Sequence, residues 1–247
     1  MGWQHFHSKM QVFVVFAFLP LVWGNPENLN PMRNKGMFEG DIAGIDPFAD
    51  RNAIPRDSQR WPGGVVPYII DSSVYYDKFL EPIKKAMAHI SEKTCITFVE
   101  RTHQKDYVRI FKGSGCWSYW GRLGIGEQKL SLKDGCEPFG TVVHELMHAI
   151  GFEHEHSRSD RDDYLNIHWE NIPDNEKHNF KKFLPHENRL LTTFDYDSIM
   201  LYGDTGYEPH YDLLSMTAKD GRKLIEVYDK PGMSPIDVKR VKMLYCS

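Results

Sequence analysis

The 247-residue sequence lacks several patterns that mark common functional classes. It has no glycine-rich phosphate loop, no internal repeat and no low-complexity tail. It also has no excess of basic residues, since 30 Lys and Arg are scattered among 34 Asp and Glu and the formal net charge is −4. A nucleic acid partner is therefore not expected. After the apolar run at residues 12–19 there is no second run long enough to span a bilayer, so we expect no membrane partner.

The first 24 residues have the pattern of a secretory signal peptide. Lys9 supplies positive charge ahead of the apolar run at 12–19, and residues 22–24 are small or apolar, as expected before a cleavage site near residue 24. A membrane anchor is the alternative, but the run is too short to span a bilayer and Pro20 interrupts its end. The sequence therefore predicts a secreted, extracellular protein.

Cysteine is scarce, with four in the whole chain. None lies in a C-x-x-C pair, which argues against a zinc site built from thiolates. Behind a signal peptide all four should be paired, because the secretory route is oxidising. Four cysteines allow three connectivities, and the spacing alone does not choose between them.

The main candidate for a functional motif lies at residues 141–162, TVVHELMHAIGFEHEHSRSDRD. The first half predicts a buried helix, apolar on nearly every side but interrupted by His144, Glu145 and His148. Buried polar groups without partners are costly, so something must satisfy these three. His144 and His148 are four residues apart and share one helical face, where two imidazoles can bind one cation.

The residues after this helix complete a metal site. Gly151 can leave the helix in a left-handed conformation at little cost, which would bring His154 back as a third nitrogen ligand. Three neutral nitrogens with one open position are typical of catalytic zinc, whereas structural sites fill all four positions. The pattern H-E-x-x-H-x-x-G-x-x-H is that of the metzincin proteases. The alternative is a core helix whose histidines bond to nearby carboxylates.

Two stretches resemble the astacin family of secreted zinc endopeptidases: GFEHEHSRSDRD, which begins at Gly151, and SIMLYG at residues 198–203. The second is similar to the astacin Met-turn. The resemblance implies that Met200 lies beneath the metal and that Tyr202 is an additional zinc ligand that swings away when substrate binds. Many relatives have histidine where this chain has Leu201, a position that is not a ligand in the family.

The resemblance implies an α+β, two-lobed, zincin-like protease with an active-site cleft, a twisted sheet and two long helices in the N-terminal lobe, and an irregular C-terminal lobe. The residues agree with it. Apolar periodicity predicts a helix over 78–94 and a last helix over 235–245. β-branched and aromatic runs predict strands at 64–71, 96–99 and 107–111. We expect a monomer with a single catalytic domain at 52–247, a short form such as those of digestive or arachnid venom astacins.

Residues 25–51 are rich in Asn, Pro, Gly and Asp and have few large apolar groups, which suits a segment with no core of its own. Within it, Phe38-Glu39-Gly40-Asp41 resembles the stretch of astacin proenzymes whose aspartate binds zinc in place of the catalytic water. The resemblance therefore implies that Asp41 keeps a zymogen latent, although an ordinary turn is the alternative. Arg51 is a natural site for a trypsin-like activating protease.

The family also implies a role for the new amino terminus. After cleavage at Arg51, Asn52 would become buried and pair with Glu155, the residue after the third zinc histidine. A buried ammonium needs such a carboxylate partner. The alternative for Glu155 is an exposed loop residue.

The family resemblance further implies the disulfides Cys95–Cys246 and Cys116–Cys136. It also places Cys116, Trp117, Ser118 and Tyr119 on an exposed edge strand that pairs antiparallel with an extended substrate. An edge strand recognises main chain, while pockets recognise side chains. Aromatic residues here, including Trp120, are alternatively core residues; both descriptions can hold because alternate strand residues face opposite ways.

The sequence predicts a zinc-dependent endopeptidase that hydrolyses extracellular proteins or peptides. One Zn²⁺ held by His144, His148 and His154 would activate a water, with Glu145 as general base and Tyr202 stabilising the oxyanion. Two alternatives are an inactive binding protein or toxin on a protease scaffold, and a zinc hydrolase of small amides or esters. The other histidines lack ligand spacing and are expected to be superficial or locally bonded: His89, His103, His156, His168, His178, His186 and His210.

Overall fold

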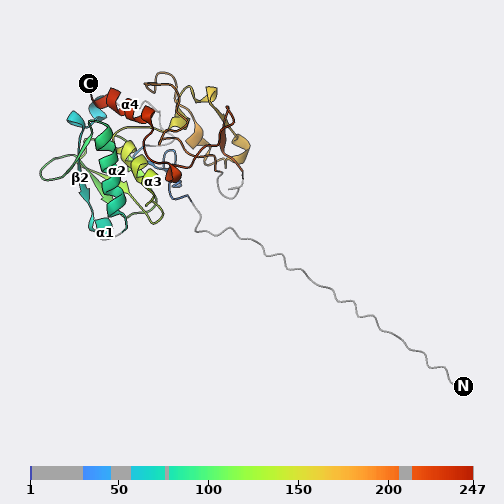
Figure 1. Ribbon diagram of the computed structural model, residues 1–247, viewed down its shortest axis with the longest axis horizontal. Helices are drawn as coiled ribbons and strands as arrows, with labels where there is room; N and C mark the ends of the chain where they lie inside the picture. The colour runs from blue at the N-terminus through green and yellow to red at the C-terminus, as the bar shows by residue number, and fades with distance from the viewer. Residues whose placement is uncertain (2–29, 46–56, 76–77, 206–212, 247) are drawn as a thin grey trace.

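The computed structural model describes residues 1, 30–45, 57–75, 78–205 and 213–246. Figure 1 shows two lobes side by side, one built from a sheet and helices and the other from mostly irregular chain. The structure has the predicted α+β architecture, with its regular structure concentrated in the N-terminal lobe. Within the described residues no helix combines the length and apolar character needed to cross a membrane.

A six-stranded sheet forms one layer of the N-terminal lobe, in the order β1-β5-β6-β4-β2-β3. Its neighbours pair in parallel except β5 and β6, which are antiparallel. The strands are β1 (Ile42–Ala43), β2 (Val65–Ile70), β3 (Thr97–Glu100), β4 (Tyr107–Phe111), β5 (Trp117–Tyr119) and β6 (Glu127–Ser131). The edge strand β1 comes from residues 30–45, which we call the N-terminal segment.

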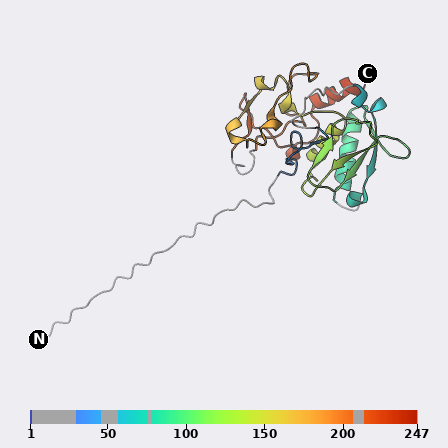
Figure 2. The ribbon, with the colours of Figure 1, turned by 180° about the vertical axis from the view of Figure 1, so that it is seen from behind.

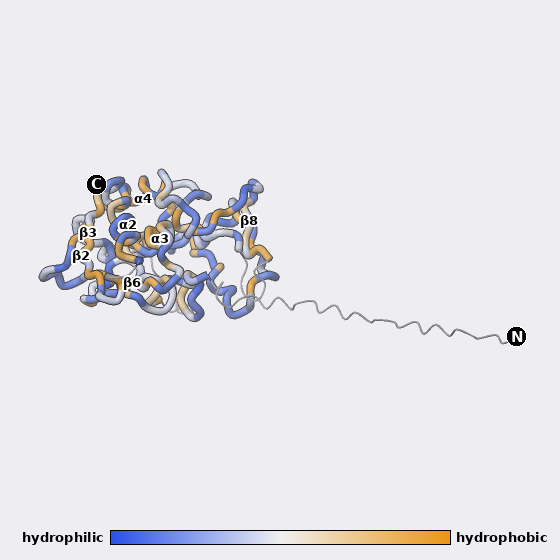
Figure 3. Tube along the Cα trace, turned by 60° about the horizontal axis from the view of Figure 1, so that its bottom comes forward, coloured by the Kyte–Doolittle hydropathy of each residue, from blue (hydrophilic) through white to orange (hydrophobic). Residues whose placement is uncertain are grey.

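Two helices pack against each other on this sheet, α2 (Leu80–Lys93) and α3 (Phe139–Ala149), after the short α1 (Ser72–Tyr75). On α2 one face is buried through Ile83, Met87 and Ile90, in agreement with the predicted periodicity. Residues 140–149 of α3 are all buried, so this helix lies inside the lobe. Figure 3 shows hydrophobic stretches of the chain gathered around it.

The C-terminal lobe has little regular structure, as predicted. It contains the antiparallel pair β7 (Leu165–Ile167) and β8 (Met216–Ala218) and several short 3-10 turns. The last helix, α4 (Pro235–Tyr245), begins at a capping box in which Ser234 and Asp237 satisfy each other's backbone N–H groups. The disulfide Cys95–Cys246 ties the end of α4 to the N-terminal lobe, and Figure 1 shows α4 beside that lobe's helices.

The N-terminal segment lies between the two lobes, where Figure 2 shows it in blue. It adds β1 in parallel to β5, with Ile42 opposite Ser118 and Ala43 opposite Tyr119. Its apolar residues Met32 and Phe38 are buried among residues of the two lobes. The segment therefore has no core of its own and uses that of the domain, as its composition suggests.

Candidate active site

Helix α3 carries the first two histidines of the predicted metal site. Its strongly apolar sequence buries it completely, so His144 and His148 are 0% exposed. Because they lie four residues apart they project from the same face, and their ring centroids are 4.6 Å apart.

The chain leaves α3 at Gly151, which has the predicted left-handed conformation with φ +96°. The N–H of Gly151 donates to the carbonyl of His148, and that of Phe152 donates to Met147. This tight ending reverses the chain and brings His154 back to the helix. The Nε2 atom of His154 lies 3.2 Å from Nε2 of His144 and 3.2 Å from Nε2 of His148.

The other ring nitrogen of each histidine faces a group that can only accept a hydrogen bond. Nδ1 of His144 is 2.8 Å from the carbonyl of Ile199, and Nδ1 of His148 is 2.7 Å from the carbonyl of Phe152. Nδ1 of His154 is 2.6 Å from a carboxylate oxygen of Glu39. When these rings are neutral, each Nδ1 therefore carries the proton, which leaves the lone pair on each Nε2 directed at the other two.

A carboxylate completes the cluster. Oδ1 of Asp41 lies 3.3 Å from Nε2 of His148 and 3.2 Å from Nε2 of His154, and Oδ2 lies 3.1 Å from Nε2 of His144. Four buried acceptors at this separation repel one another unless a positive charge lies between them. Burial alone would lower the pKa of His154, yet the carboxylates of Asp41 and Glu39 raise it to about 10. The surroundings of this ring therefore favour a positive charge at Nε2, which either a proton or a cation in its place can supply. The arrangement thus fits a small divalent cation held by three imidazoles and a carboxylate.

Tyr202 approaches the same point from the other lobe. Its hydroxyl donates a short hydrogen bond to Oδ2 of Asp41. Its ring stacks on His144 at a centroid distance of 5.7 Å and lies 4.6 Å from that of His154. In this structure the Tyr202 hydroxyl is therefore paired with the carboxylate of the N-terminal segment.

The backbone of the N-terminal segment is bent so that both of its acids reach the histidines. Glu39 has a left-handed conformation with φ +53°, and Gly40 follows with φ +94°. A Cβ on Gly40 would come within 3.1 Å of the carbonyl of Met32, so glycine is needed for the close turn. A non-glycine residue held at positive φ stores strain, and such strain occurs often at functional sites.

Glu145 directly follows His144 on α3 and is 0% exposed. Neither of its carboxylate oxygens has a hydrogen-bond partner among the residues that the structure describes. Burial raises the pKa of Glu145 well above its usual value, and the nearby Asp41 carboxylate adds to this effect. A buried acid with a raised pKa and no partner is suited to accept and return a proton.

The turn at residues 198–202 is fixed by polar contacts on two sides. Asp237 of α4 accepts from the hydroxyl of Ser198 at 2.7 Å and from the N–H of Ile199 at 2.8 Å. Lys230 donates to the carbonyls of Ser198 at 2.6 Å and Leu201 at 2.5 Å. Since the carbonyl of Ile199 accepts from His144, these contacts position the first histidine indirectly.

Residues 53–246 match the model of the peptidase family described as Astacin. The chain belongs to the astacin family. Astacins are zinc metalloendopeptidases, and the predicted family and enzyme class are therefore confirmed.

The chain is also similar to individual astacin-like metalloproteases. The chain is 41% identical over 214 residues to "Astacin-like metalloprotease toxin 2" of Loxosceles intermedia, which covers 85% of this chain and 82% of that one. It is 36% identical over 231 residues to "Zinc metalloproteinase nas-6" of Caenorhabditis elegans, covering 86% and 64%. Among solved structures it resembles high choriolytic enzyme 1, a hatching enzyme zinc-protease of Oryzias latipes, with a TM-score of 0.70, 38% identity and coverage of 78% and 98%.

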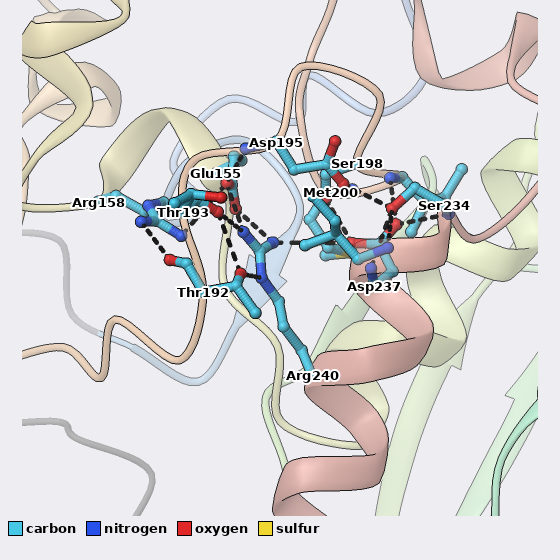
Figure 4. A network of polar contacts seen from close by, with 12 residues as sticks. Glu155, Arg158, Thr192, Thr193, Asp195, Ser198, Met200, Ser234, Asp237 and Arg240 are labelled. Atoms are coloured by element: carbon cyan, nitrogen blue, oxygen red, sulfur yellow. Dashed lines mark hydrogen bonds and ion pairs between the residues drawn. The ribbon is translucent and has the colours of Figure 1, made fainter.

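Glu155, expected to receive the amino terminus of an activated astacin, is buried and already paired. Arg240 of α4 donates to both of its carboxylate oxygens, each at 2.7 Å (Figure 4). Nη1 of Arg158 lies 3.3 Å from Oε1 of Glu155, and the N–H of Asp195 donates to the same oxygen. The exposed-loop alternative is therefore wrong for Glu155. Asn52 and Arg51 lie outside the described residues.

The two disulfides are Cys95–Cys246 and Cys116–Cys136, the pairs that the family resemblance implies. The second joins Cys116, which directly precedes β5, to the chain ahead of α3. Trp117 and Ser118 are buried and Tyr119 is half-buried, and β1 of the N-terminal segment pairs along them. The indole of Trp117 also contacts Phe111 and Tyr119, which agrees with the core role named as the alternative for these aromatic residues.

Sequence reasoning missed several residues at the site. Glu39 stands at the variable position of the F-x-G-D stretch, and only the folded turn reveals that it contacts His154. His156, expected to be superficial or locally bonded, is buried, with its ring stacked on His154 at 5.0 Å. Its H-x-H spacing from His154 was the available signal. Arg240 gave no signal, because 85 residues separate it from Glu155.

Proposed function

We propose that this astacin is made as a secreted zymogen and hydrolyses peptide bonds of extracellular proteins. His144, His148 and His154 would hold one zinc ion. The observation that carries this proposal is the convergence of three Nε2 lone pairs, each fixed by an acceptor at the opposite ring nitrogen. Residues 1–24 would be the signal peptide, 25–51 the propeptide and 52–247 the catalytic domain, acting as a monomer.

The chemistry follows from the position of each side chain. A zinc ion in this site supplies a Lewis acid that polarises a carbonyl oxygen and lowers the pKa of a water molecule. Glu145, unpaired and buried, takes a proton from the attacking water and returns it to the leaving amine. The Tyr202 hydroxyl, released from Asp41, donates to the developing oxyanion. Met200 takes no part in proton transfer and packs in the turn below.

Latency would reside in the N-terminal segment. Asp41 occupies the position that the substrate carbonyl and water need, and Tyr202 is held by the same carboxylate. The segment runs parallel to β5, whereas a substrate would pair antiparallel along residues 116–119. The segment therefore enters the site in the reverse direction and places no scissile bond there.

Activation by a trypsin-like protease after Arg51 would release this segment and create an ammonium at Asn52. A cavity of about 80 Å³ adjoins Glu155, Arg240 and His154 and has room for a small polar group. Because Arg240 already satisfies both Glu155 oxygens, the ammonium would join an existing pair instead of neutralising an isolated acid.

The test uses the full chain, cleaved by trypsin after Arg51, beside a Glu145→Gln variant treated identically. We expect one zinc per chain in both proteins. Peptide hydrolysis should fall by about 10² to 10⁴ in the variant, which is the usual contribution of a general base. Absence of zinc would overturn the proposal, and hydrolysis retained by Glu145→Gln would remove Glu145 from its role. Zinc-loaded wild-type protein that cleaves no peptide would instead favour a binding protein on a protease scaffold.

A further inference from the structure

A small apolar cluster separate from the main core lies beside the metal ligands. It consists of Phe38, Ile42, Trp120 and Phe183, which are 2%, 1%, 4% and 4% exposed, with half-buried Ile45 packed against it. Phe38 and Ile42 face each other across the tight turn of the N-terminal segment, where the N–H of Ile42 donates to the carbonyl of Phe38 at 3.0 Å.

The two remaining members come one from each lobe. Trp120 directly follows β5 in the N-terminal lobe, and Phe183 lies in the irregular C-terminal lobe. Removal of the N-terminal segment takes away every other residue of this cluster, so both aromatic rings lose their apolar partners. Without the N-terminal segment, the rings of Trp120 and Phe183 would border the space that Phe38 and Ile42 leave. This space forms a site for an apolar ligand group, since burying the rings again is favourable.

Trp120 supplies a second and independent observation. Its indole nitrogen is buried, and it finds no acceptor within the described part of the chain. A buried donor without a partner carries a desolvation cost. The N-terminal segment thus fills the apolar volume but leaves this N–H unsatisfied, whereas a ligand with an additional carbonyl near the ring could satisfy it.

The pairing of β1 with β5 shows on which side of the scissile bond the site at Trp120 and Phe183 would lie. Asp41 lies at the metal ligands, Ile42 pairs with Ser118, Ala43 pairs with Tyr119, and Trp120 comes next. The N-terminal segment thus runs away from the metal towards Trp120. A substrate antiparallel to β5 runs from Trp120 towards the metal, so the residues near Trp120 precede the scissile bond.

We propose that Trp120 and Phe183 select substrates with a large apolar side chain, aromatic or branched aliphatic, within the three residues before the cleaved bond. The inference rests on the endopeptidase function proposed above and specifies its substrate class. In the zymogen, Phe38 and Ile42 occupy the place of that side chain.

The first experiment profiles cleavage of a peptide library by the full chain after activation at Arg51, and by its Trp120→Ala and Phe183→Ala variants. We expect kcat/KM for peptides with Phe or Leu before the cut bond to fall by about 10- to 100-fold in each variant. Peptides with Gly or Ser there should change by less than about threefold. Trp169→Ala is the matched control, because Trp169 is a tryptophan outside the cluster that is 41% exposed. An unchanged profile in both cluster variants would overturn the proposal.

Trp120→Phe separates packing from hydrogen bonding. The ring remains and the N–H is lost, so the preference for large apolar residues should persist while kcat/KM falls several-fold for all peptides. If this variant instead behaves as Trp120→Ala, apolar contact is not what the site contributes.

Peptide binding tests the site without any need for catalysis. A synthetic peptide of residues 30–45 and its Phe38→Ala counterpart are titrated into activated Glu145→Gln chains, one with Trp120 intact and one that also carries Trp120→Ala. We expect Phe38→Ala to weaken binding at least tenfold to the chain with Trp120 and less than threefold to the Trp120→Ala chain. Equal losses of affinity in the two chains would contradict the proposal. If instead the effect of Phe38→Ala depends on Trp120 as expected but the activated wild-type chain cleaves no peptide, the endopeptidase function fails and the apolar site stands.

Discussion

The guanidinium of Arg240 donates two hydrogen bonds of 2.7 Å to the carboxylate of Glu155, which lies 85 residues earlier in the chain. One turn earlier on the same helix, Asp237 holds the turn that carries the carbonyl partner of His144. A single face of α4 therefore holds Glu155, next to His154, and the turn whose carbonyl accepts from His144 (Figure 4). Outer contacts of this kind orient metal ligands and tune affinity.

Replacing Arg240 with Gln should destabilise the protein by about 3–5 kcal/mol, because the buried Glu155 carboxylate loses its bidentate partner. The free energy of unfolding in urea, measured at fixed zinc concentration, checks this. We also expect zinc affinity to fall by about 10-fold or more, since Glu155 adjoins His154.

The matched control is Arg222→Gln. Arg222 pairs with Asp220 at 2.8 Å, but the two side chains are 48% and 42% exposed. Such surface pairs contribute about 0–1 kcal/mol, so this variant should remain close to wild type. Equal losses for both arginines would contradict a special role for the pair on α4.

Because Lys230 is buried, we expect the free energy of unfolding to depend on pH above about pH 8. Burial disfavours its ammonium and lowers its pKa to about 8, from the ordinary value of 10.5, although Asp237 and Glu226 oppose the shift. Between these two pH values the unfolded chain binds a proton that the folded chain does not, so Lys230 makes stability rise with pH across that window. The neutral amine still donates to the carbonyls of Ser198 and Leu201.

The measurement compares unfolding free energies of wild type and Lys230→Met from pH 7 to 11. The difference curve should rise between about pH 8 and 10.5 and be flat below pH 8. A difference that does not change across the window would show that the ammonium is not disfavoured in the folded protein.

Elements with strong local signals were predicted accurately from the sequence. The last helix has the bounds that its apolar period and Pro235 indicate, and β4 occupies the predicted residues Tyr107–Phe111. The predicted helix over 78–94 is shorter in the structure, Leu80–Lys93, because Phe79 forms its N-terminal boundary. Two strands of the six-stranded sheet were missed: β6 is polar at four of its five residues, EQKLS, and β1 has only two residues. Neither contains enough alternation to predict pairing.

In the candidate active site, too, residues within a local motif were predictable and contacts between distant residues were not. His144, Glu145, His148 and His154 lie within one short motif, so local geometry alone predicts that they converge. The contacts of Arg240 with Glu155 and of Phe183 with the N-terminal segment join residues far apart in the chain. No spacing rule encodes such pairs, since the register depends on how the two lobes fold together.

The two disulfides should differ in their contribution to stability. Cys95 and Cys246 are separated by 151 residues, and Cys116 and Cys136 by 20. By the chain-entropy model these loops contribute roughly 5 and 3 kcal/mol respectively. Paired Cys→Ser variants should therefore lower the unfolding free energy more for the first pair, as measured by chemical denaturation. A larger loss for the 116–136 pair would show that local packing around the buried cysteines outweighs chain entropy.

Asp41 provides the sharpest test of latency, because its carboxylate contacts all three histidines and accepts from Tyr202. The experiment uses the full chain with Arg51→Gln, which blocks processing, with and without Asp41→Ala. Hydrogen bonds to charged groups contribute about 1.5–3 kcal/mol each, so their loss should raise basal peptide hydrolysis by roughly tenfold or more. Lys35→Ala is the control, since Lys35 is an exposed residue of the same segment. If the Asp41→Ala chain binds zinc and yet stays as silent as its parent, the backbone of the N-terminal segment alone, paired along β5, is sufficient to block the site.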